Sequence, residues 1–123
     1  MLDVLKHYRE QEKYDLHEFV IMPDHLHLLL TPAFDIYLER TVQLIKGGFS
    51  YRLGKAGLFA ITKGVVWQES FTNHRIRDEQ DYAHHVEYIR TNPVRAHLTD
   101  TPESYPHSSA SMKLRKVVLN PAI

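Results

Sequence analysis

The fold depends first on a stretch that reads Phe19-Val20-Ile21-Met22-Pro23-Asp24-His25-Leu26-His27-Leu28-Leu29-Leu30. Two apolar segments separated by a Pro-Asp turn signal predict a β-hairpin. Because alternate side chains of a strand leave opposite faces, the leucines at 26, 28 and 30 are expected to anchor one face in the core. His25 and His27 then share the other face, about 6.6 Å apart at the backbone, and face a different layer.

Helical periodicity flanks this hairpin. Apolar spacing predicts helices over residues 1–12 and from about 36 to 54, the second capped by Asp35. A third helix is expected from Glu79, capped by Asp78, to about residue 91, because a residue that precedes proline disfavours the helical region. The remaining predictions are a loop over 55–65, an extended segment over Val66–Ile76, a short turn over 95–98 and a loop-like tail from about 102, in which residues 113–119 could be ordered.

The order helix, hairpin, helix, strand, helix predicts an α+β fold. We expect a ferredoxin-like antiparallel sheet with helices, in which the first strand is missing. At 123 residues the chain has room for one core, so residues 1–123 are predicted to form a single domain.

Composition excludes several classes of protein. Lys and Arg total 15 and Asp and Glu total 15, so net charge alone indicates no acidic partner. The absence of cysteine removes disulfides, thiolate nucleophiles and cysteine-bound metals. Without a signal peptide or an apolar run of about 20 residues, a cytoplasmic protein with no membrane partner is expected.

Charge is nevertheless concentrated in the middle of the chain. Residues 40–77 contain seven basic side chains and one acidic side chain, a local charge of +6. Aromatic residues are interleaved with them, a mixture typical of nucleic-acid binding. A solvated basic helix face over buried aromatics is an equally good interpretation. The candidate DNA-binding residues are Arg40, Lys46, Arg52, Lys55, Lys63, Arg75 and Arg77.

The last long helix brings three polar side chains onto one face. His84, Tyr88 and Asn92 are each four residues apart. Tyr88 offers a phenol nucleophile, and the Asn92 amide oxygen suits a hard divalent ion that the histidines at 25 and 27 could share. Each feature alone has a simpler interpretation: a core tyrosine, a helix cap and a histidine pair on an open hairpin face.

Together these motifs resemble the single-tyrosine HUH transposases, and most closely their REP-associated tyrosine transposase branch. The resemblance rests on the hairpin sequence quoted above and on Asp81-Tyr82-Ala83-His84-His85-Val86-Glu87-Tyr88-Ile89-Arg90-Thr91-Asn92-Pro93-Val94. It covers most of residues 14–110, because Trp67-Gln68-Glu69-Ser70-Phe71, Asn73-His74-Arg75-Ile76-Arg77-Asp78 and Tyr105-Pro106-His107-Ser108-Ser109 are also similar to that branch.

The resemblance implies a role for each matched residue. His25 and His27 correspond to the histidines of the HUH motif, Tyr88 to the nucleophile, and Asn92 to the residue that completes the metal site, with His84 as a rival ligand. The family uses Mg²⁺ or Mn²⁺ to cut single-stranded DNA beside a hairpin, such as a REP-like element or a transposon end. It leaves a 5′-phosphotyrosine link and a free 3′-OH, from which strand transfer follows.

The start of the chain departs from the family pattern, in which a strand precedes the first helix. Truncation, a strand from elsewhere or from a homodimer partner, and a degraded copy are the alternatives. The competing functions are a catalytically inactive hairpin-binding protein and a small metal-dependent hydrolase. Tyr82, the other tyrosine of the helix, is expected to lie in the core.

Overall fold

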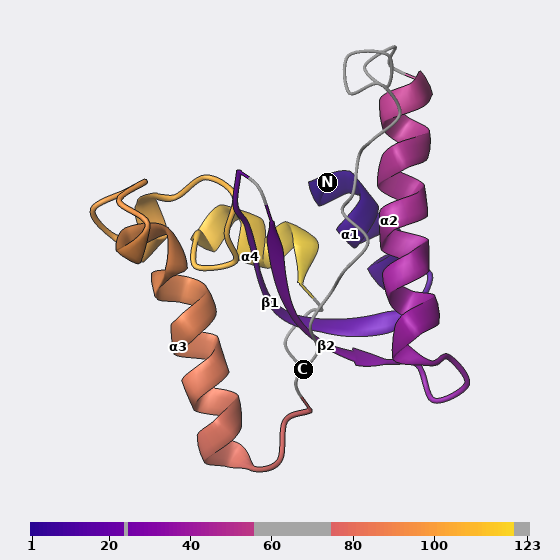
Figure 1. Cartoon of the computed structure of the whole chain (residues 1–123), viewed down its shortest axis with the longest axis horizontal. Helices are drawn as coiled ribbons and strands as arrows, with labels where there is room; N and C mark the ends of the chain where they lie inside the picture. The colour runs from indigo at the N-terminus through magenta and orange to yellow at the C-terminus, as the bar shows by residue number, and fades with distance from the viewer. Residues whose placement is uncertain (24, 56–74, 120–123) are drawn as a thin grey trace.

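The computed structural model describes residues 1–23, 25–55 and 75–119, and the side chains of 50–55 lie outside this description. Two strands form an antiparallel hairpin, and helices lie on both sides of it (Figure 1). The α+β class with an antiparallel sheet is therefore confirmed. The elements are α1 (Leu2–Glu10), β1 (Tyr14–Ile21), β2 (Leu26–Pro32), α2 (Leu38–Lys55), α3 (Glu79–Arg95), the 3₁₀ helix η1 (Pro102–Ser104) and α4 (Met112–Val118).

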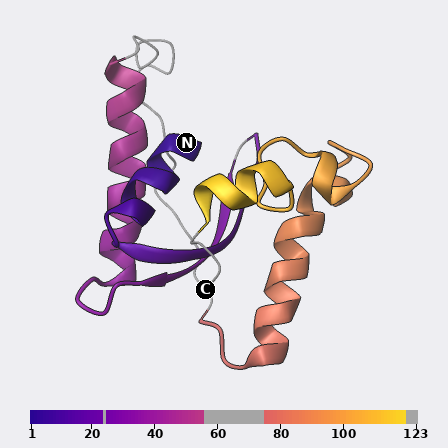
Figure 2. The ribbon, with the colours of Figure 1, turned by 180° about the vertical axis from the view of Figure 1, so that it is seen from behind.

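The helices form two layers. In Figure 1, α2 and α3 stand on opposite sides of the hairpin, and α1 packs against α2. Figure 2, seen from behind, shows α4 alongside α1, with which it is in contact. The larger core joins α1, β1, α2 and α4 through Val4, Leu5, Tyr14, Leu16, Phe19, Ile45, Val118 and Leu119. The smaller core joins the hairpin to α3 through Val20, Met22, Leu29, Ile89 and Tyr105.

The hairpin has the predicted facing of its side chains, with one irregularity. Leu26, Leu28 and Leu30 pack against the larger core, as expected. In β1 the register shifts between Leu16, which pairs with Leu30, and Glu18, which pairs with Leu29. The extra residue between them is a β-bulge, which reverses the alternation of the following residues. Glu18 consequently lies on the same side of the hairpin as α3.

The carboxylate of Glu18 joins four parts of the fold. Arg90 of α3 donates a hydrogen bond to it at 2.7 Å and Arg115 of α4 donates another at 2.8 Å. The Ser109 hydroxyl donates to its second oxygen. Burial alone would raise the pKa of Glu18, but these hydrogen bonds together lower it below its ordinary value. The cluster thereby ties α3 and the C-terminal segment to β1.

We expect Glu18 to make stability depend on pH in the acidic range. Because the folded-state pKa is lowered, the contribution of Glu18 is complete above its ordinary pKa of 4.5 and is lost as the pH falls through the folded value. The difference in unfolding free energy between the wild type and Glu18→Gln should be constant from pH 7 to 5 and shrink below 4.5. Urea titrations across this range measure it, and a constant difference down to pH 3 would contradict it.

The C-terminal tail is more ordered than predicted. The Ile21 amide donates to the His107 carbonyl at 2.8 Å and the Ser109 amide donates to the Phe19 carbonyl at 3.0 Å, so residues 107–109 pair with the edge of β1. Ser108 is fully buried there. The prediction of a loop from residue 102 was thus partly wrong, because Ser-rich and Pro-rich composition does not reveal pairing to a distant strand edge. The order expected over 113–119 corresponds to α4.

Several predicted helix boundaries also differ. The first helix, expected over residues 1–12, ends at Glu10. The second helix begins at Leu38, because the Ile36 amide bonds to the Ala33 carbonyl in a preceding turn. The third helix passes through Pro93 and ends at Arg95 instead of stopping at residue 91. Pro93 removes one helical N–H, but its ring is fully buried, and that packing offsets the loss.

Several predictions fall largely outside the described ranges. They include the loop over 55–65, apart from its first residue, and the extended segment Val66–Ile76, of which only the last two residues are described and form no strand. Within the described residues, no helix has the length and apolar character needed to cross a membrane. The single domain and the cytoplasmic location stay predictions.

Candidate active site

Helix α3 is fixed on the hairpin at several points. Asp78 caps its first turn, since its carboxylate accepts a hydrogen bond from the Asp81 amide at 2.8 Å, as predicted. Ile89 and Pro93 are buried on the side of α3 that faces the protein. Together with the Arg90–Glu18 ion pair, these contacts fix the position of α3 relative to the strands.

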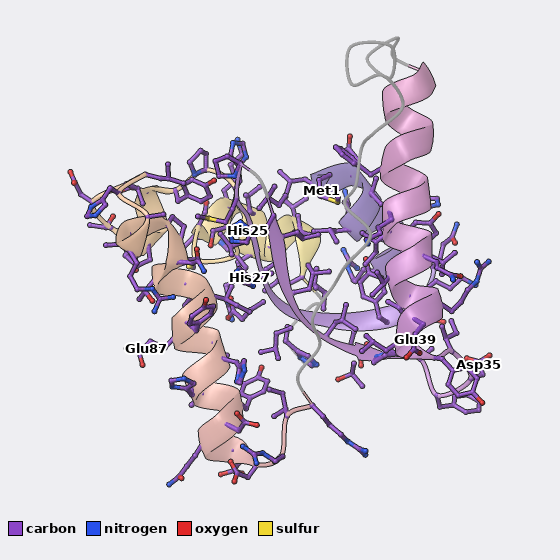
Figure 3. All side chains as sticks on the ribbon, in the orientation of Figure 1. Met1, His25, His27, Asp35, Glu39 and Glu87 are labelled. Carbon is purple, nitrogen blue, oxygen red and sulfur yellow. The ribbon has the colours of Figure 1, made fainter. Side chains whose placement is uncertain are left out.

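The structure brings Tyr88 of α3 against the histidine pair of the hairpin. The ring of His27, in β2, lies 5.4 Å from the ring of Tyr88, and the rings of His25 and His27 lie 4.8 Å apart. In Figure 3 the two labelled histidines lie between the hairpin and α3. His25 comes just before β2 and is exposed, whereas His27 is half-buried. Three polar rings from two distant segments therefore form one continuous cluster.

The environment of His27 favours its neutral form. Burial, with the nearby His25 and Arg95, lowers the pKa of His27 below its ordinary value of 6.5. A neutral imidazole can bind a metal ion, whereas a protonated one cannot. The cluster is thus chemically suited to metal binding at neutral pH.

Tyr88 keeps contact with solvent. Its side chain is 42% exposed, so the expectation of a core tyrosine does not describe it. Tyr82 is also 39% exposed, and its ring lies 5.9 Å from that of His17. The prediction that Tyr82 belongs to the core was therefore wrong, because the smaller core reaches α3 through Ile89 and Val86 instead.

The third metal ligand is less closely defined. Asn92 is half-buried one turn after Tyr88 on the same helix. Among the described residues, His25 and His27 are not joined by a third His, Asp or Glu in a group that could hold a metal ion. The rival ligand His84 is thus not gathered with the pair, while the amide of Asn92 stays a prediction.

The sequence interpretation missed Arg95. Its guanidinium lies 4.3 Å from the centre of the Tyr88 ring, and one of its N–H groups donates to the Tyr88 carbonyl at 2.8 Å. Arg95 follows Tyr88 by seven residues, which is two helical turns. That spacing could have indicated the contact, but the expected end of the helix at residue 91 concealed it.

Of the seven basic residues of the +6 segment, the structure describes the side chains of four, and no contact of these four with Tyr88 is seen. Arg40 and Lys46 belong to α2, on the other side of the hairpin from α3 (Figure 1). Arg75 and Arg77 are exposed just before α3, and Arg77 pairs with Asp81 at 3.7 Å. The side chains of Arg52 and Lys55 and the whole of Lys63 lie outside the described residues.

Comparison with known proteins finds relatives that share much of this sequence. The REP-associated tyrosine transposase of Escherichia coli (strain K12) is 28% identical over 102 residues, which are 82% of this chain and 57% of that protein. A Haemophilus influenzae relative with a provisional version of the same name is 32% identical over 96 residues, 72% of this chain and 54% of that protein. The chain thus spans little more than half the length of these relatives.

A solved structure and a family model are also similar to this chain. A solved REP-associated tyrosine transposase bound to a REP hairpin superimposes with a TM-score of 0.72 at 24% identity, covering 96% of this chain and 67% of that one. The model of the IS200-like transposases matches residues 1–92, three quarters of the chain, including both histidines and Tyr88. The chain belongs to the IS200-like transposase family.

Proposed function

We propose that this protein nicks single-stranded DNA beside a hairpin and transfers the cut strand through Tyr88. The observation that carries the proposal is the 5.4 Å contact between the rings of Tyr88 and His27, which come from separate elements. A phenol that is partly exposed and whose ring contacts the His27 imidazole is accessible to a phosphodiester. The names of the curated relatives support the same assignment.

The proposed reaction is an in-line phosphoryl transfer. The Tyr88 phenol oxygen attacks phosphorus and loses its proton, the bond from phosphorus to the 3′-oxygen breaks, and that oxygen leaves as a 3′-OH after taking up a proton. The products are a 5′-phosphotyrosine and a free 3′ end. Because the link remains a phosphodiester, a second 3′-OH can displace the tyrosine by the same step without ATP.

His25, His27 and Asn92 are the residues that would hold a divalent cation. When bound, the cation would neutralise charge on the scissile phosphate and help the 3′-oxygen leave. Imidazole nitrogens are softer ligands than Mg²⁺ prefers, so of the two ions expected we propose that Mn²⁺ binds more tightly. The lowered pKa of His27 favours the neutral imidazole that metal binding requires.

The proposed DNA partner is a hairpin. The solved relative is bound to a REP hairpin, and this chain covers 67% of that protein. We propose a related hairpin with a single-stranded flank as the substrate, and a homodimer as the assembly that binds it. An inactive hairpin-binding protein is the second candidate, favoured because, among the described residues, no third His, Asp or Glu joins His25 and His27 in a group that could hold a metal ion.

A nicking assay separates the two candidates. A labelled DNA hairpin with a single-stranded flank is incubated with the protein and Mn²⁺, and the products are resolved on a denaturing gel. A transposase releases a shortened strand with a 3′-OH and leaves labelled protein. A protein that only binds shifts the hairpin on a native gel but leaves every strand intact.

We expect the proposed ligands to differ in their importance for metal binding. His27→Ala should lower Mn²⁺ affinity by at least about tenfold, since even residues that only support a ligand can cost that much. Asn92→Ala should cost less, because water can replace one neutral amide oxygen. Calorimetric Mn²⁺ titrations of the folded variants measure both losses. If His27→Ala bound Mn²⁺ with wild-type affinity while Asn92→Ala lost Mn²⁺ binding, the metal site would have to be assigned to α3 and not to the hairpin.

A further inference from the structure

Arg95 is held against the proposed nucleophile by two separate contacts. Its guanidinium carbon lies 4.3 Å from the centre of the Tyr88 ring. One N–H group donates to the Tyr88 main-chain oxygen at 2.8 Å. The same cation is close enough to His27 to act on its charge. Arg95 therefore belongs to the Tyr88–His27 cluster, although it lies at the end of α3.

In the described structure, no carboxylate neutralises the charge of Arg95. Arg90 and Arg115 pair with Glu18, and Arg77 pairs with Asp81. Within residues 1–23, 25–55 and 75–119, by contrast, Arg95 forms no ion pair with a carboxylate, and its side chain is exposed. A guanidinium has five N–H donors, of which the Tyr88 carbonyl occupies one. The remaining donors are available to an anion.

The hydrogen bond to Tyr88 fixes the position of the guanidinium. In a regular helix the Tyr88 carbonyl already accepts the amide of Asn92, four residues later. The hydrogen bond from Arg95 is a second one to this carbonyl, which already has a hydrogen-bond partner without it. This second bond holds the flexible guanidinium of Arg95 over the ring of Tyr88, which lies two helical turns earlier.

We propose that Arg95 is a catalytic residue that binds the non-bridging oxygens of the scissile phosphate beside Tyr88. This inference rests on the proposed nicking reaction and deepens it. A planar guanidinium is suited to phosphate because two of its N–H groups can bind two oxygens together. Bound in this way, the phosphate would lie beside the phenol that attacks it, and its developing charge would be stabilised.

The test compares adduct formation by Arg95→Gln and Arg95→Lys at saturating DNA. Loss of the cation should slow single-turnover adduct formation by about 100-fold, as loss of one preorganised donor does in other active sites. Lysine keeps the charge without the two-pronged geometry, so its rate should be intermediate. The control is Lys113→Gln, an equal loss of charge at an exposed position of α4, which should leave the rate unchanged.

A neutral substrate distinguishes phosphate binding from a purely structural role. With a methylphosphonate at the scissile position, Arg95→Gln should react within about threefold of the wild type, because the charge that Arg95 recognises is gone. An equal 100-fold loss on both substrates would mean that Arg95 only orients Tyr88, and would overturn the proposal. Thermal unfolding of both variants should match the wild type, since the side chain is exposed.

The outcome also separates this inference from the proposed function. If the wild type forms an adduct and Arg95→Gln forms it equally fast on the natural phosphodiester, only the role of Arg95 is refuted. If the wild type forms no adduct with any hairpin while it still binds DNA, the nicking reaction itself is refuted, and the role of Arg95 is refuted with it.

Discussion

Replacing Tyr88 with phenylalanine should abolish the covalent protein–DNA adduct. The substitution keeps the ring that contacts His27 and Arg95 and removes only the phenol oxygen, the atom that attacks phosphorus. Folding should be unaffected, because the side chain is partly exposed and takes no part in either core. Adduct yield on a denaturing gel should fall below detection, while hairpin affinity on a native gel stays within about threefold.

Tyr82→Phe is the matched control. Tyr82 lies on the same helix, is similarly exposed and contacts His17 through its ring, but it is not part of the His27 cluster. Its adduct yield should equal that of the wild type. If Tyr88→Phe forms the full adduct and Tyr82→Phe forms none, the nucleophile is Tyr82 and the geometry around His27 has another purpose.

The second large effect concerns stability. Glu18→Gln should lower the free energy of unfolding by about 3 kcal/mol, toward the lower end of the cost of breaking a buried ion pair. Glu18 is buried, but the side chains of Arg90 and Arg115 are 40% and 37% exposed. Water can therefore solvate these two guanidinium groups in part when they lose their carboxylate partner. Urea denaturation monitored by circular dichroism measures the change at pH 7.

Asp100→Asn removes one carboxylate from an exposed position and serves as the control. It should change the unfolding free energy by less than about 0.5 kcal/mol. Equal stability of Glu18→Gln and the wild type would contradict the view that Glu18 holds α3 and the C-terminal segment on β1. In that case the apolar contacts of Ile89 and Tyr105 would be sufficient to place α3.

Local signals in the sequence were sufficient to predict the hairpin and the helices α1, α2 and α3, apart from their exact ends. The Pro-Asp turn and the alternating leucines specify the hairpin because strand facing depends only on neighbouring residues. The pairing of residues 107–109 with β1 could not be predicted, since it joins segments almost 90 residues apart. Nor does any local pattern show that buried Pro93 lies within a continuing helix.

The site was predictable to a similar extent. The spacing of His25 and His27 predicts one shared face, and the resemblance to the family assigns Tyr88 to the same chemistry. The contact between Tyr88 and His27 depends on how α3 sits on the hairpin, to which the ion pair of Glu18 and Arg90 contributes together with the buried side of α3. A buried glutamate in a strand cannot be recognised from sequence as the partner of an arginine 72 residues away, and Arg95 escaped notice because its helix was expected to end earlier.

The most direct test is to identify the residue that carries the DNA after reaction. The protein is incubated with a hairpin substrate and Mn²⁺, digested with a nuclease and trypsin, and the peptides are examined by mass spectrometry. We expect a nucleotide attached through a 5′-phosphate to Tyr88, in a peptide between Arg77 and Arg90. A nicked substrate with no modified peptide, or with the nucleotide on another residue, would contradict the assignment of Tyr88 as the nucleophile.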